Sequence, residues 1–194
     1  VRISARATWA RDALGNIKNL RINHQRVIQG LVRVFKFTPD KDTRWRVARI
    51  LEEIAKGNET TIQELAQVLT STLDEDIRRA AAMILGKIGR GNQTAIDALM
   101  WVIELIPDEY TNLRWRAAWS LGEIDLGNRT AIREFEMVLH SSQDENTLLK
   151  AAKILGKIEP GNQIAIDSVM RVLNPIQDRL TILEAGMILS DIGR

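Results

Sequence analysis

The chain has 194 residues, no cysteine and a formal net charge of only +2. The absence of thiols excludes a disulfide framework, a thiolate metal site and a cysteine nucleophile. No apolar run approaches the ~18 residues of a membrane span and no signal-peptide pattern opens the chain, so we expect a protein of the cytoplasm.

A Gly-Asn pair recurs along the chain at nearly constant spacing. It stands at positions 57–58, 91–92, 127–128 and 161–162, so the intervals are 34, 36 and 34 residues. Self-similarity at this period is typical of stacked-repeat proteins. Glycine readily ends a helix in the left-handed conformation, and asparagine readily caps the helix that follows. Each pair therefore predicts a hinge between two helices.

The predicted elements form helix pairs, in which a helix A precedes a helix B. A lone B-type helix is predicted at residues 5–17, and a degenerate hinge follows it at residues 21–24. We expect about eleven helices in one all-α solenoid of stacked antiparallel pairs. The predicted divisions are a half unit 1–22 and five units, 23–56, 57–90, 91–126, 127–160 and 161–194.

The third unit is two residues longer than its neighbours. Asp74 and Arg78 are four residues apart, whereas the equivalent Asp108 and Arg114 are six apart, so we expect an extended turn at 109–112. Both ends of the chain carry the pattern of internal repeats rather than polar caps. We therefore expect a segment of a larger protein whose last helix pair is its weakest part, so that residues 179–194 open before residues 75–124.

Each B segment repeats a core of small and apolar residues, behind an acidic turn and an early arginine. The residues that carry this pattern are Asp74, Arg78, Ala81, Ala82, Leu85, Gly86 and Ile88, then Asp108, Arg114, Ala117, Ala118, Leu121, Gly122 and Ile124. The pattern resembles HEAT repeats, in the short form of the phycobilin-lyase-type HEAT-like repeats. The resemblance covers nearly the whole chain and implies a solenoid whose B helices line a concave groove. Leu148 and Ile182 replace the arginine in the last two units, so any Asp–Arg ladder should stop before them.

The residues give no indication of catalysis. The two histidines, His24 and His140, fall in different units. No cluster of His, Asp and Glu has metal-ligand spacing, and no glycine-rich loop has the pattern of a nucleotide-binding motif. We expect no enzyme activity, no metal and no cofactor.

The outward face of the B helices carries residues that core packing does not explain. Helical periodicity places them opposite the apolar stripe. The predicted partner-binding groove consists of Trp45, Arg46, Arg49, Arg79, Met83, Trp115, Arg116, Trp119, Leu149, Lys150 and Lys153. Tryptophan with arginine is the composition of interface hot spots. The alternative is that the tryptophans pack against a neighbouring helix or under arginine stems. Trp101, outward on an A helix beside Met137, is a second candidate contact.

Three function classes fit this pattern. The first is a non-catalytic interaction or scaffold module for a protein or peptide, within a larger chain such as a signalling NTPase. The resemblance to bilin lyases implies a second class, in which the groove holds a linear tetrapyrrole whose propionates meet arginine. The third is nucleic-acid binding, as in HEAT-like alkylpurine glycosylases. The weak net charge and the interleaved Glu53, Glu123 and Asp191 count against this third class.

Overall fold

The computed structural model describes residues 24–106, 111–174 and 178–193, and every regular element in these ranges is an α-helix. The ten helices are α2 (His24–Phe37), α3 (Lys41–Ile54), α4 (Glu59–Ser71), α5 (Glu75–Ile88), α6 (Gln93–Leu105), α7 (Thr111–Ile124), α8 (Arg129–Ser141), α9 (Glu145–Ile158), α10 (Gln163–Leu173) and α11 (Arg179–Ile192). The predicted all-α solenoid is confirmed. The helix expected at residues 5–17 lies outside the described residues, as do residues 109 and 110 of the expected extended turn, whereas residues 111 and 112 of that turn belong to α7.

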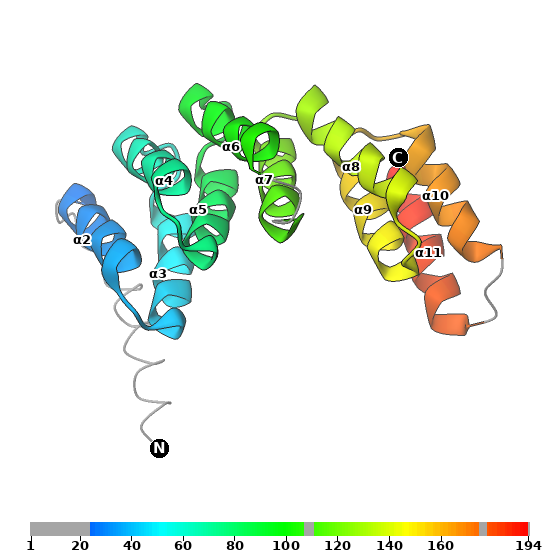
Figure 1. Ribbon diagram of the computed structural model, residues 1–194, viewed down its shortest axis with the longest axis horizontal. Helices are drawn as coiled ribbons and strands as arrows, with labels where there is room; N and C mark the ends of the chain where they lie inside the picture. The colour runs from blue at the N-terminus through cyan, green and yellow to red at the C-terminus, as the bar shows by residue number, and fades with distance from the viewer. Residues whose placement is uncertain (1–23, 107–110, 175–177, 194) are drawn as a thin grey trace, which may run out of the picture.

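The helices form two rows. We call α2, α4, α6, α8 and α10 row A, and α3, α5, α7, α9 and α11 row B. A helix packs against its pair partner, as α4 does against α5, and against the next helix of its own row, as α4 does against α6. In Figure 1 the pairs follow one another along an arc from α2 to α11. Buried side chains between the rows form a continuous core along this stack.

The Gly-Asn hinges adopt the conformation that their sequence predicts. The four hinge glycines have positive φ, from 67° at Gly57 to 78° at Gly127, where a side chain would be strained. The asparagine then begins the next helix, because the Asn58 side-chain oxygen accepts a hydrogen bond from the backbone N–H of Thr61 at 3.0 Å. The same cap is formed by Asn92, Asn128 and Asn162.

A second hydrogen bond connects most hinges to the next unit. The backbone N–H of Gly91 donates to the carbonyl of Ile124, at the end of the following row-B helix, at 3.0 Å. The equivalent bonds join Gly57 to Ile88 at 2.9 Å and Gly161 to Ile192 at 2.8 Å. These bonds fix how far apart successive row-B helices end, so they help to set the spacing of the stack.

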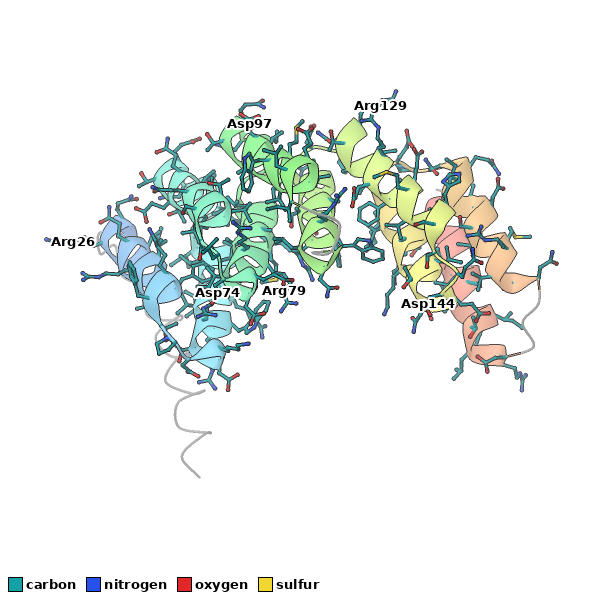
Figure 2. All side chains as sticks on the ribbon, viewed as in Figure 1. Arg26, Asp74, Arg79, Asp97, Arg129 and Asp144 are labelled. Atoms are coloured by element: carbon teal, nitrogen blue, oxygen red, sulfur yellow. The ribbon has the colours of Figure 1, made fainter. Side chains whose placement is uncertain are left out.

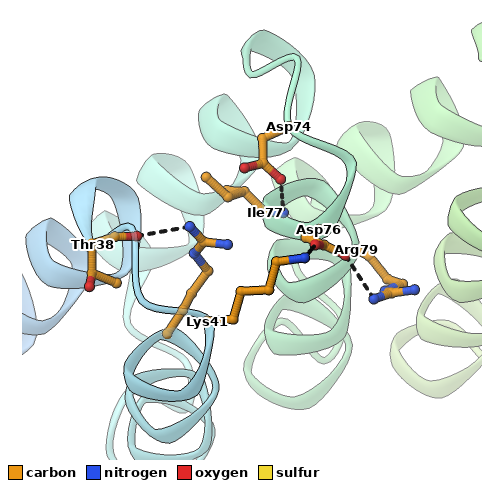
Figure 3. Close-up of polar contacts among 7 residues, drawn as sticks. Thr38, Lys41, Asp74, Asp76, Ile77 and Arg79 are labelled. Carbon is orange, nitrogen blue, oxygen red and sulfur yellow. Dashed lines mark hydrogen bonds and ion pairs between the residues drawn. The ribbon is translucent and has the colours of Figure 1, made fainter.

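The turns inside the pairs are held by polar contacts (Figure 3). Asp74 caps α5, and the buried guanidinium of Arg44 donates to the Thr38 carbonyl, just past the end of α2, at 2.8 Å. Lys41 forms an ion pair at 2.5 Å with Asp76 of the next unit. Arg44 therefore stabilises the turn between α2 and α3 of its own unit, and Lys41 forms the ion pair to the neighbouring unit.

Candidate functional site

Row B is packed unevenly along the stack. Helices α5 and α7 lie in close contact, whereas α7 and α9 scarcely touch. Figure 1 shows the wider spacing between α7 and the α8–α9 pair. At the close junction the backbone of Gly86 faces Ser120, and a Cβ at position 86 would lie 2.7 Å from the Ser120 Cβ. The repeat places isoleucine, Ile84 and Ile154, where α7 has Ser120, so the small residue allows this approach.

The junction between α7 and α9 is closed at one end only. A Cβ at Gly122, near the end of α7, would lie 2.3 Å from Cδ1 of Ile158, the last residue of α9. Among the described hinge glycines, Gly127 alone lacks the N–H bond to the end of the next row-B helix. We call the open part of this junction, which Trp115 and Trp119 of α7 and Ile154 of α9 line, the α7–α9 wedge.

Two tryptophans of α7 project at this junction. The ring of Trp115 meets Phe135 of α8 edge-on, with 5.7 Å between centroids and 67° between planes. The guanidinium carbon of Arg116 lies 4.9 Å from the ring centroid of Trp119, in the range of a cation–π contact. Both tryptophans are half-buried and pack against the core. They therefore support the junction, as the packing alternative predicts, and they also present aromatic surface to the hollow beside it.

Behind the tryptophans, a buried ion pair joins α7 to α8. The Nε–H of Arg114 donates to Oε1 of Glu134 at 3.1 Å, and a terminal N–H donates to Oε2 at 2.7 Å. The side chains are only 14% and 7% exposed. This two-point contact has fixed geometry and is stronger than a neutral hydrogen bond. It therefore holds the third unit against the fourth where row B is open.

A hollow of about 620 Å³ opens on row B beside the wedge. It is lined by Trp45, Arg79, Asn112, Trp115, Arg116, Trp119, Lys150, Lys153, Ile154 and Lys157. These residues come from α3, α5, α7 and α9. The hollow therefore crosses four successive helices of row B, and we call it the row-B groove. In Figure 2, Arg79 of α5 and Asp144, which caps α9, lie on the lower side of the stack, opposite Asp97 and Arg129.

The lining of the row-B groove is cationic, since no acidic residue among those described contributes to it. The guanidinium of Arg79 donates to Asp76 at 3.0 Å. Burial, reinforced by repulsion from Arg79, lowers the pKa of the Arg116 guanidinium, which stays charged at neutral pH. Three exposed lysines of α9 form no ion pair with any described residue: Lys150, Lys153 and Lys157.

Comparison with known families identifies the repeat. A model of HEAT repeats matches residues 6–86 and 27–104, which together cover 99 of the 194 residues. The protein belongs to the HEAT-repeat family. Membership of this family indicates a role in protein interaction or as a scaffold, and HEAT repeats are generally non-catalytic. The match does not single out the phycobilin-lyase type. No curated protein matches the sequence.

This HEAT-repeat protein brings seven of the eleven predicted site residues to the row-B groove. They are Trp45, Arg79, Trp115, Arg116, Trp119, Lys150 and Lys153. The placement of Leu149 on the outward face is wrong, since it is only 3% exposed and packs in the core. Leu148 beside it is also buried, so the buried face of α9 is wider than the repeat pattern predicts. Arg46 and Arg49 are exposed beside the groove, and Met83 packs partly against the core.

Three lining residues were not among those predicted. Lys157 follows Lys153 by one helical turn, so the periodicity of α9 could have added it. Ile154 belongs to the apolar column of the repeat and is only 7% exposed, but it still lines the groove where α7 and α9 pack loosely. Asn112 lies in the expected extended turn, where the repeat does not predict side-chain positions, and the structure places it in the first turn of α7. Trp101 is half-buried and packs against the core, with the Arg78 guanidinium 6.0 Å from its ring centroid.

The described residues contain no group of three or more His, Cys, Asp or Glu side chains that could hold a metal ion. His140 is exposed on α8, where its Nδ1 lies 2.7 Å from the Glu136 carbonyl oxygen. None of the helices in the described ranges is both long and apolar enough to cross a membrane. The chemical features of this HEAT-repeat protein are thus concentrated in the aromatic and cationic row-B groove.

Proposed function

We propose that this HEAT-repeat protein is a non-catalytic module that binds a partner protein along the row-B groove. One observation carries the proposal: three tryptophans and five cationic residues line a single open hollow. Tryptophan and arginine are enriched among residues that dominate binding energies. Trp45 is 39% exposed although it is large and apolar, so binding a partner there would remove apolar surface from water.

The span of the groove favours an extended protein segment over a compact ligand. Neighbouring packed helices lie roughly 8–10 Å apart, so the three steps from α3 to α9 cover at least about 25 Å. An extended chain advances ~3.3 Å per residue, and about eight residues therefore cross the groove. Trp45 at one end and Lys157 at the other would both contact such a segment, since both line the groove.

Photochemical cross-linking tests the proposal directly. Lys153, which is exposed in the groove, is replaced by photoreactive benzoylphenylalanine, and the protein is irradiated in cells that normally produce it. The matched control carries the same group at Arg90, which is exposed at a hinge and does not line the groove. We expect a discrete protein adduct from position 153 alone. Adding Trp45→Ala should weaken it, since loss of a hot-spot tryptophan costs about 2 kcal/mol or more of binding.

Several outcomes would contradict the proposal. The same adducts from both positions, or none from position 153, would show that the groove is not a protein-binding surface. A long-wavelength absorbance band after incubation with a bilin, lost on Arg116→Ala, would assign the groove to a tetrapyrrole instead. Salt-dependent binding of an oligonucleotide, lost on the same change, would assign it to nucleic acid. Trp115 and Trp119 are left intact in these variants because both pack against the core and Trp115 also contacts Phe135 of α8.

A further inference from the structure

Three lysines of α9 line the groove and form no ion pair with any described residue. Lys150, Lys153 and Lys157 are separated by three and four residues, so they share one face of the helix. They line the same hollow and pair with no acidic residue among those described. Like charges at this spacing repel one another, and a negatively charged ligand would relieve that repulsion.

Apolar surface lies directly beside these lysines. Trp115 and Trp119 from α7 and Ile154 from α9 line the groove on the two sides of the α7–α9 wedge. In the neighbouring junction α5 and α7 lie in close contact, whereas α7 and α9 scarcely touch, so Ile154 lines the groove although it is only 7% exposed. The groove thus offers an apolar slot and a cationic strip on adjoining surfaces.

We propose that the partner of the row-B groove is an acidic peptide segment that carries one bulky apolar side chain. Its carboxylates meet the lysines of α9, and its apolar side chain enters the α7–α9 wedge between Trp119 and Ile154. The rest of the segment crosses α7 and α5 toward Trp45. This inference rests on the proposed function and adds the chemical class of the partner.

The distribution of charge favours such a peptide over nucleic acid. Three cations without an ion pair among the described residues cluster on α9. Such cations on α3 and α7 (Arg46, Arg49 and Arg116) instead share the outward faces of their row with the acidic residues Glu53, Asp76 and Glu123 of α3, α5 and α7. Asp76 already contacts two cations, and Glu123 is paired with Lys87 at 2.6 Å. A phosphodiester chain carries a negative charge at every nucleotide, so it would meet these carboxylates as it crossed the row. A peptide can place its carboxylates over α9 alone.

Selection from a random library tests the chemical class without assuming a sequence. Peptides of about 12 residues, long enough to span the groove, are displayed on phage and selected on the wild-type protein. Counter-selection uses Lys150→Glu/Lys153→Glu. The matched control is Lys56→Glu/Arg90→Glu, which makes the same change in net charge at exposed positions outside the groove. We expect the selected peptides to be enriched in Asp and Glu around one aromatic or aliphatic residue.

Synthetic versions of the enriched peptides are then measured by fluorescence anisotropy. We expect the groove double variant to weaken binding by about tenfold or more, because two attractions become repulsions. The control double variant should change it less than about twofold, since its charges lie away from the groove. Replacing the peptide carboxylates by amides should weaken binding similarly, and replacing the apolar residue by glycine should also weaken it. Thermal melts of both variants confirm that they fold.

The outcomes separate the two proposals. Enrichment of neutral or basic peptides that still depend on groove residues would overturn the acidic class and leave protein binding at the groove intact. Peptides that bind both double variants as well as the wild type would overturn the groove itself as the binding surface. Tighter binding of single-stranded oligothymidylate than of any selected peptide, lost in the groove double variant, would replace the peptide with nucleic acid.

Discussion

Two adjacent junctions of the same repeat are built differently. Between α5 and α7 the stack is closed by small residues, Gly86 against Ser120, and by the hinge bond from Gly91 to Ile124. Between α7 and α9 that bond is missing among the described residues, and only Gly122 approaches the next row-B helix closely. An aromatic contact and a buried ion pair to α8 hold this second junction. A repeat array can therefore leave one row open at a junction if contacts of the other row, here those between α7 and α8, hold the two units together.

The difference also explains where the groove lies. Solenoid stability comes from repeat interiors and nearest-neighbour interfaces. A junction that closes fully through row B leaves no space between its two helices for a ligand side chain to enter. The α7–α9 junction keeps its interface between α7 and α8, so its row-B side remains available. The following predictions compare the closed and open junctions, beginning with the largest expected effect.

Breaking the ion pair at the open junction should have the largest effect. Glu134→Ala removes the carboxylate that accepts two hydrogen bonds from the Arg114 guanidinium in a largely buried site, and breaking such a pair typically costs about 3–5 kcal/mol of unfolding free energy. Chemical denaturation of the variant measures this loss. Replacing both residues, with Arg114→Met and Glu134→Leu, should recover most of it, because two apolar groups need no partner. Equal losses in the single and double variants would show that packing, and not charge, accounts for the effect.

Adding a methyl group at the two glycines should distinguish the junctions. In Gly86→Ala the new Cβ meets the backbone Cα of Ser120 at 2.9 Å, so we expect a loss of about 1–3 kcal/mol in unfolding free energy. In Gly122→Ala it meets the far end of the Ile158 side chain, which can rotate, so the loss should be smaller. Thermal unfolding of both variants gives the comparison.

Gly186→Ala on α11 provides the matched control for these two variants. A Cβ at this position meets nothing within 4 Å. The substitution should stabilise the protein by about 0.5–1 kcal/mol, because alanine loses less backbone freedom than glycine in a helix. If Gly122→Ala proves as costly as Gly86→Ala, α7 and α9 are packed as rigidly as α5 and α7.

The fold could be predicted from the sequence because each structural need is met by a local pattern. The left-handed glycine and the capping asparagine at 57–58 and 91–92 mark the helix ends directly. The apolar period then determines which face of each helix is buried. At these positions the local preference of the residues agrees with the conformation that stacking requires, so the sequence predicts the helix boundaries of the stack.

The groove could be predicted only in part. Periodicity identifies the outward column, which includes Trp45 and Trp119, but it does not show which junction is open. That depends on contacts between units, such as the pairing of Arg114 with Glu134. The sequence signals of the uneven spacing are single departures from the repeat, above all Ser120 in place of isoleucine. Such a departure is informative only once the neighbour that it contacts is known.

Hydrogen exchange of the hinge amides should report the missing bond directly. The N–H groups of Gly57, Gly91 and Gly161 donate to carbonyls of the next unit, whereas Gly127 has no such acceptor among the described residues. We expect the first three amides to be protected by folding and the Gly127 amide to exchange much faster. Two-dimensional NMR of the protein in deuterated buffer resolves the four signals. Comparable protection at Gly127 would mean that the open junction closes in solution.

The smallest expected effect concerns a carboxylate near the closed junction. Burial raises the pKa of Glu52 on α3 above its usual 4.5, despite nearby Lys87 and Arg49, and its Oε1 lacks a hydrogen-bond partner. The folded protein therefore binds this proton more tightly than the unfolded chain. The resulting stability is fully present below about pH 4.5 and is lost as the pH rises through the higher folded pKa.

Glu52→Gln removes the ionisation and so should raise the unfolding free energy at pH 7 but not below pH 4.5. Because the side chain is only partly buried, solvent screening should keep the gain within about 1 kcal/mol. Denaturation of wild type and variant across this pH range measures the difference. Glu53→Gln, at the exposed neighbouring position, controls for the loss of a carboxylate. A gain that is equal at both pH values would show that burial of the Glu52 charge is not its cause.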